Sequence, residues 1–130
     1  MNLEIIANLI IEAGLGVEGV SLFIDHMPET CEVGVMIRNP LQGNPINHYI
    51  PGYEKWQFQI IVRDRKHVDG QRRSDALGAL LYFSNRDFMQ DNGVNLHVNF
   101  CRPRTRPVTY PRLPNNLIEW STMFEVNSAE

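Results

Sequence analysis

The strongest constraint on the fold is a two-residue alternation of apolar and polar side chains, which recurs in four segments of the chain. In the clearest of them the apolar positions are Trp56, Phe58, Ile60 and Val62. Successive side chains of a β-strand point to opposite faces of a sheet, so this period predicts a half-buried strand. The same pattern predicts strands over residues 31–38, 94–101 and 118–126, and a short apolar run within 17–25 is typical of a short strand or a connector.

Two other segments have apolar residues at helical spacing. Residues 2–13 place five apolar side chains on one side, and Gly14 and Gly16 follow where the helix has to end. A second helix is predicted over about residues 71–85, with Asp69 as its cap. Its apolar face would consist of Ala76, Leu77, Leu80, Leu81 and Phe83.

Most of the predicted strands are linked without a helix between them, which favours antiparallel pairing. The expected fold is therefore α+β: a mostly antiparallel β-sheet with two amphipathic helices packed on one face, in the order α-β-β-β-α-β-β. A chain of 130 residues with 43% hydrophobic residues is expected to form a single domain over residues 1–130. The other sheet face is expected to be polar, with Gln57, Gln59, Asn95, His97, Asn99, Glu119 and Ser121.

A long loop is predicted over residues 39–53, where prolines and glycines are too dense for regular pairing. Aromatic and aliphatic side chains on an exposed segment are often interface anchors. The loop therefore supplies four candidates for a subunit interface, Ile46, His48, Tyr49 and Tyr53. The alternative is a loop that folds back on its own sheet.

A second irregular segment, residues 102–114, interleaves arginines with prolines, and a short polar tail is expected at 127–130. The arginines Arg102, Arg104, Arg106 and Arg112 could contact nucleic-acid phosphates, pair with carboxylates of a neighbouring subunit, or remain in a solvated loop. The formal net charge of −3 weakens the nucleic-acid alternative. They are therefore also candidates for a subunit interface.

Other kinds of site find little support. Cys31 and Cys101 are expected to be reduced, buried thiols, and the histidines lack the spacing of metal ligands, so neither metal nor cofactor is expected. Asp25, His26 and Glu29 form the one cluster suited to acid/base catalysis, and its alternative is a solvated loop. No apolar run approaches a membrane span and the N-terminus lacks a signal-peptide core, so the chain is expected in a cytoplasm.

A resemblance adds to these expectations. In order, the first helix, Pro28-Glu29, the strand Cys31 to Arg38, the Gly/Pro-rich loop, the strand Trp56 to Arg63 and the helix with Ala76-Leu77 resemble the tail terminator and minor capsid proteins of long-tailed bacteriophages. The most telling part is the Gln59 to Arg63 strand followed by the Ala/Leu helix. The likeness covers roughly residues 2–84.

The resemblance implies a virion structural protein and not an enzyme. It implies a homo-oligomeric ring, commonly of six subunits, that closes the finished tail tube and joins it to the head connector. The partners would be the tail tube protein and the head connector protein, with no membrane, and with nucleic acid only as DNA passing through the ring. The protein would be made in the host cytoplasm and lie at the head-proximal end of the tail. Alternatives are another head-tail completion or tail tube protein, or a small nucleic-acid-binding module using the arginines.

Overall fold

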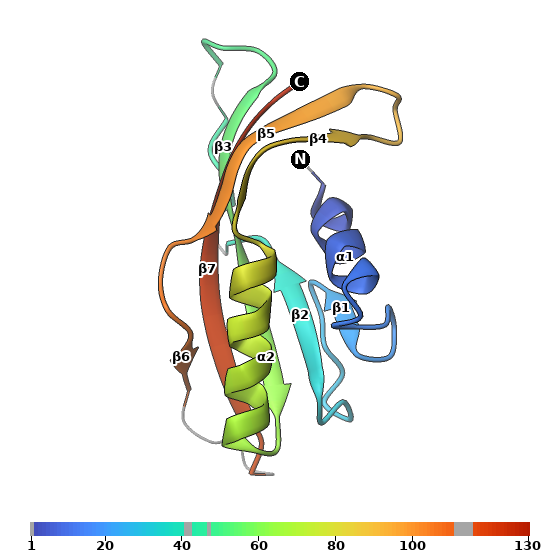
Figure 1. Ribbon diagram of the computed structural model, residues 1–130, viewed down its shortest axis with the longest axis vertical. Helices are drawn as coiled ribbons and strands as arrows, with labels where there is room; N and C mark the ends of the chain where they lie inside the picture. Colours follow the sequence, from blue (N-terminus) through green and yellow to red (C-terminus); the bar gives the residue numbers. More distant parts are fainter. Residues whose placement is uncertain (1, 41–42, 47, 111–115) are drawn as a thin grey trace.

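The computed structural model describes residues 2–40, 43–46, 48–110 and 116–130. These residues form two helices and one curled sheet of seven strands (Figure 1). In chain order the elements are α1 (Leu3–Glu12), β1 (Leu22–Ile24), β2 (Gly34–Arg38), β3 (Tyr53–Asp64), α2 (His67–Leu80), β4 (Phe83–Met89), β5 (Asn95–Pro103), β6 (Val108–Thr109) and β7 (Ile118–Ala129).

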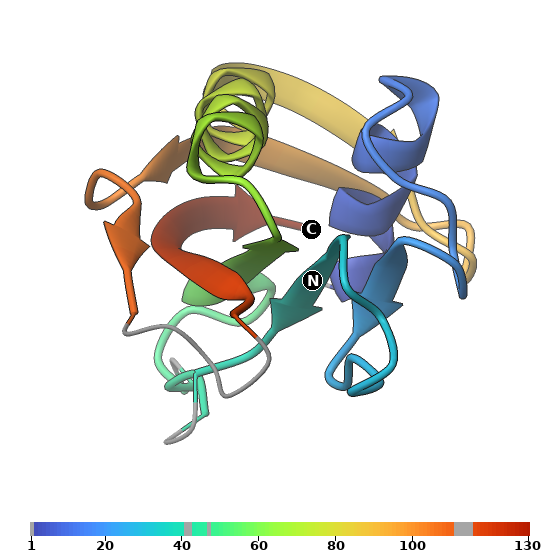
Figure 2. The same cartoon turned by 90° about the horizontal axis from the view of Figure 1, so that it is seen from below.

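The strand order across the sheet is β1-β2-β3-β7-β5-β4, and β6 pairs with β7 beside this path. β1 and β2 are parallel, and every other described pair is antiparallel. Both helices lie on the same side of the sheet, which curls round them (Figure 2). The predicted α+β class, with a mostly antiparallel sheet and two helices on one face, is therefore confirmed, with β4 and β6 as additional strands.

The centre of the sheet is the long pair β3 and β7, which are hydrogen-bonded from Tyr53↔Ala129 to Asp64↔Ile118. The apolar side chains of the alternating pattern point to the helix side of this pair and are buried. Phe58 and Phe124 stack there with ring centroids 5.0 Å apart. The two-residue period thus places one apolar face of a 12-residue strand pair beneath the helices.

Each helix packs on this core through a narrow stripe of buried residues. α1 begins at the Asn2 cap, whose side-chain oxygen accepts a hydrogen bond from the Glu4 backbone N–H, and it buries Ile6 and Ile10 completely. α2 approaches the sheet so closely at Gly70 that an added Cβ would lie 2.1 Å from the indole ring of Trp120. The position of α2 therefore depends on a residue without a side chain.

The predicted second helix was placed wrongly at both ends. α2 begins at His67 after Lys66, which makes no side-chain cap hydrogen bond, so Asp69 lies inside the first turn and is not the cap. It ends at Leu80, and Phe83 belongs to β4. Asn85, with φ of 51°, is skipped in the pairing of β4 with β5. This irregularity interrupts the two-residue period, which is why the alternation does not reveal β4.

The alternation predicted for the strand over residues 94–101 also needs correction. A bulge between Val98 and Phe100 shifts the register of β5 against β7. Beyond it Cys101 is buried, while the Arg102 guanidinium lies 4.5 Å over the Phe100 ring. One extra residue in a strand exchanges the faces of all residues that follow it. The simple alternation therefore holds only up to Val98.

The polar tail predicted at 127–130 is for the most part a strand. β7 continues to Ala129 and pairs there with β3 on one side and β5 on the other. Asn127 and Ser128 are buried in consequence. The segment 102–114 is also partly regular, since it includes the end of β5 and all of β6, and residues 111–115, with Arg112, lie outside the described residues.

The two thiols differ in burial, which predicts different reactivity. Cys101 is buried, and burial raises the pKa of its thiol to about 12. Cys31 is half-buried, and its Sγ lies 3.3 Å from the Val33 carbonyl oxygen. Because the thiolate is the reactive form, we expect alkylation at pH 8 to be at least about tenfold faster at Cys31 in the folded protein. Mass spectrometry of labelled peptides measures both rates, and equal rates before unfolding in urea would contradict this.

Candidate assembly surfaces

The Asn44 side chain fixes the loop between β2 and β3 to the edge of the sheet. The Asn44 Nδ2 donates to the Gln57 carbonyl at 3.1 Å, and the Asn44 Oδ1 accepts from the Gln57 N–H at 2.7 Å. The amide thereby occupies the edge of β3 beyond the end of β2, as a neighbouring strand would. Sequence patterns do not reveal this role, because Asn44 reads there only as a turn former.

Beyond this anchor the loop turns outward. The Ile46 side chain is 76% exposed and that of Tyr49 is 95% exposed, and His48 is exposed as well. Tyr53, the fourth candidate, is half-buried at the start of β3, and its hydroxyl accepts a hydrogen bond from Asn127. Three of the four loop candidates are thus presented to solvent, and the fourth belongs to the sheet.

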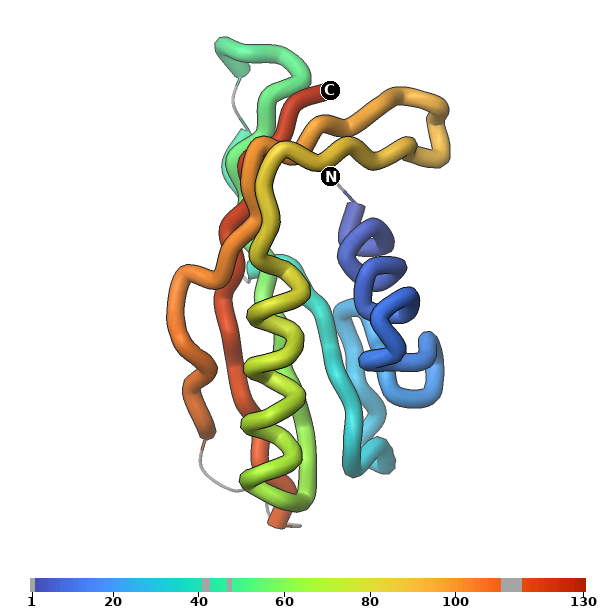
Figure 3. The backbone as a smooth tube through the Cα atoms, viewed as in Figure 1, coloured from blue at the N-terminus to red at the C-terminus, as the bar shows by residue number. Residues whose placement is uncertain are grey.

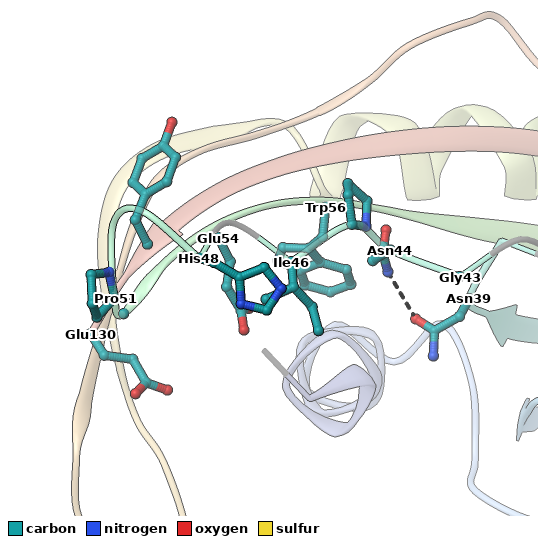
Figure 4. A pocket seen from close by; sticks show the side chains of 12 residues that line it. Asn39, Gly43, Asn44, Ile46, His48, Pro51, Glu54, Trp56 and Glu130 are labelled. Atoms are coloured by element: carbon teal, nitrogen blue, oxygen red, sulfur yellow. Dashed lines mark hydrogen bonds between the residues drawn. The ribbon is translucent and has the colours of Figure 1, made fainter.

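A hollow of about 630 Å³ lies between this loop and the start of β3. Figure 4 shows Ile46 and Trp56 near its middle, with Glu130 toward one end and Asn39 toward the other. The indole Nε1 of Trp56 is buried and has no hydrogen-bond partner in the described part of the chain. The loop is attached at Asn44 and also near its end, where the Gly52 carbonyl accepts a hydrogen bond from the Glu130 N–H at 2.9 Å.

The arginines divide into different roles. The Arg102 Nε lies 2.5 Å from the Glu125 Oε1, and the Arg104 Nη1 donates to the Gln57 Oε1 at 2.9 Å. Both guanidinium groups are thus held by their own sheet. Arg106 is exposed, and none of the residues that the structure describes forms an ion pair with it. The three described arginines of this segment therefore do not form a row of free guanidinium groups that could follow a phosphate backbone.

Polar side chains on the sheet face away from the helices bind one another. Gln59 donates to the Ser121 hydroxyl at 2.7 Å, and Asn99 donates to Asn127 at 2.7 Å. On the same face Arg63 pairs with Glu119 at 3.2 Å. These bonds link neighbouring strands. The outer face is consequently a hydrogen-bonded surface and not an apolar one awaiting cover.

The hairpin of β4 and β5 carries one further charged contact. The His97 Nδ1 lies 2.8 Å from the Asp87 Oδ1 across the two strands. Hydrogen bonds from His97 and Asn95 hold the pKa of the Asp87 carboxyl below its usual value. The pair is exposed, so it contributes little to stability.

The cluster suggested for acid/base catalysis lies at the surface. Asp25, His26 and Glu29 are all exposed, and Asp25 has a left-handed backbone with φ of 66°. Among the described residues there is no group of three or more His, Cys, Asp or Glu side chains arranged to hold a metal ion. No described helix is both long and apolar enough to cross a membrane.

Comparison with known proteins gives one informative result. The family model described as "Bacteriophage tail terminator protein" matches residues 9–129. This match covers most of the chain and includes the loop, the arginines and the C-terminal strand. No match was found among curated proteins.

Proposed function

This chain belongs to the bacteriophage tail terminator family, and on that premise we propose that it forms a ring that closes the tail tube and joins it to the head connector. Membership of the family makes it a structural component of the phage tail. In more detail, we propose a ring of six subunits at the head-proximal end of the tail. The protein would be synthesised in the host cytoplasm.

The observation that carries the proposal is the outward-facing loop tip, which among the described residues consists of Ile46, His48, Tyr49 and Ile50. It lies at one end of the long axis of the molecule, beside the C-terminal end of β7 (Figure 3). Exposed apolar side chains grouped at a protruding end suit contact with another protein. We place the contact with an adjoining tail or head protein at this tip.

A ring also requires side-to-side contacts between copies. Closed rings are built from heterologous contacts, in which two different surfaces of each subunit meet. The curled sheet presents distinct elements on its two sides, α1 and β1 on one and β6 on the other (Figure 2). The two sides can therefore supply the two different surfaces that a heterologous contact requires.

Assembly can be tested directly. The purified protein is followed by analytical ultracentrifugation over a range of concentrations, and by negative-stain microscopy after mixing with tail tubes that lack a terminator. We expect rings in solution or at one end of the tubes. A chain that stays monomeric and never binds a tube end contradicts the proposed function.

The loop tip predicts a specific loss of binding. In the double variant Ile46→Asp and Tyr49→Ser we expect affinity for tube ends or for the connector to fall at least about tenfold, because anchor residues contribute most of the binding energy. Stability should be unchanged, since both side chains are exposed. The matched control is Val68→Asp with Tyr82→Ser on and after α2, where the side chains are 65% and 68% exposed. If both double variants bind equally well, the tip is not the contact.

A further inference from the structure

Charge is unevenly distributed along the chain. Residues 2–37 contain no lysine or arginine, and their acidic residues are Glu4, Glu12, Glu18, Asp25, Glu29 and Glu32. Residues 99–118 show the reverse, with four arginines and no acidic residue. Two parts of one molecule thus carry opposite charge, although the whole is only weakly acidic.

The acidic part includes an exposed surface that we call the acidic patch, consisting of Ile11, Glu12, Val17, Glu18 and Val20. All five side chains are exposed, and the segment 13–21 leads from the end of α1 to β1. In the described part of the chain neither Glu12 nor Glu18 has an ion-pair partner. The patch therefore combines unpaired carboxylates with exposed aliphatic side chains.

The end of α1 adds to the negative character of this patch. A helix C-terminus carries a partial negative charge, which lysine or arginine in the last turn commonly offsets. The last turn of α1 has no basic residue and instead ends with Glu12. A cation supplied from outside the subunit would be favourable at this point.

The opposite surface, which we call the basic patch, consists of Arg104, Arg106, Val108 and Tyr110. All four are exposed, and Arg104 is held in place by its hydrogen bond to Gln57. β6, which carries Val108, pairs with β7 on one side and with no other described strand. This patch also combines charge with exposed apolar side chains, but its charge is positive.

The two patches lie on opposite sides of the molecule. The segment after α1 and the strand β6 are separated by the width of the sheet both in Figure 1 and in Figure 2. A single subunit therefore does not bring them together. Copies arranged around a ring can do so, because a heterologous contact joins one side of each copy to the other side of the next.

From this complementarity we propose that the acidic patch of one copy docks on the basic patch of the next copy. The inference rests on the proposed ring and names its lateral interface. Arg106 and Arg104 then lie against Glu12, Glu18 and the C-terminal end of α1, while Val108 and Tyr110 cover the exposed aliphatic side chains. Charges of opposite sign fix the order of neighbours, and the apolar contacts exclude water.

Charge reversal tests this interface. We expect Arg106→Glu, and separately Glu18→Arg, to raise the protein concentration needed for half-assembly at least about tenfold, since each places like charges together at every contact of the ring. The double variant Arg106→Glu with Glu18→Arg should recover most of the assembly. Sedimentation measures the ring fraction, and circular dichroism of each variant checks that the fold is retained.

Controls separate this interface from the proposed function itself. Arg72→Glu and Asp91→Arg make the same changes of charge at exposed positions outside both patches, and we expect them to assemble like the unmodified protein. If the unmodified protein forms rings that the patch reversals leave intact, or if the double variant fails to recover, the interface is wrong while the ring stands. If the unmodified protein forms no ring, the proposed function fails first.

Discussion

Replacement of Gly70 by alanine is expected to lower the free energy of unfolding by about 3 kcal/mol or more. The new Cβ would lie 2.1 Å from one atom of the Trp120 ring and 2.2 Å from another. Trp120 is fully buried, and its Nε1 donates to Gln71 on the same helix at 3.2 Å. Neither the ring nor the helix backbone can move away without losing this packing, so α2 would have to lift off the sheet.

Gly78 provides the matched control on the same helix. Nothing lies within 4 Å of a Cβ added there, so Gly78→Ala should gain helix propensity and stabilise the protein by about 0.5–1 kcal/mol. Urea denaturation followed by circular dichroism measures both variants. Should the two alanine variants differ by less than about 1 kcal/mol, α2 does not rest on Trp120 as described.

The role of Gly70 illustrates where sequence patterns stop. Read alone, a glycine inside a helical segment only weakens the prediction of a helix. Its purpose depends on Trp120, which lies 50 residues later and faces it from β7. Alternation located β3, β5 and β7 because their periods follow from backbone geometry. It missed β4 and the shift at Phe100, since an irregularity in pairing is set by the neighbouring strand.

The candidate surfaces were predictable to a similar extent. The density of turn-forming residues located the loop. Apolar and aromatic residues among its prolines suggested exposed side chains, and Ile46, His48 and Tyr49 are exposed. The roles of Arg102 and Arg104 could not be predicted, because their partners Glu125 and Gln57 lie on other strands. Pairing between distant segments decides which charges remain available to another molecule.

At the C-terminal end of β7, the sequence-based expectation and the structure predict very different effects of substitution. A polar tail at 127–130 would tolerate any substitution, whereas the structure buries Ser128 completely between β3 and β5. We therefore expect Ser128→Lys to cost about 3 kcal/mol or more, because an ammonium group without a partner would enter the core side of the sheet. Thermal and urea unfolding give the magnitude.

Two further variants make this result specific. The Ser128 hydroxyl is buried without a hydrogen-bond partner in the described residues, so Ser128→Ala should leave stability unchanged or raise it slightly. Glu130→Lys places the same lysine side chain two residues later at an exposed position and should change stability by less than about 0.5 kcal/mol. A loss confined to Ser128→Lys shows that β7 extends past Val126 and holds β3 and β5 together. If both lysine variants are tolerated equally, residues 127–130 form a tail and do not pair with β5.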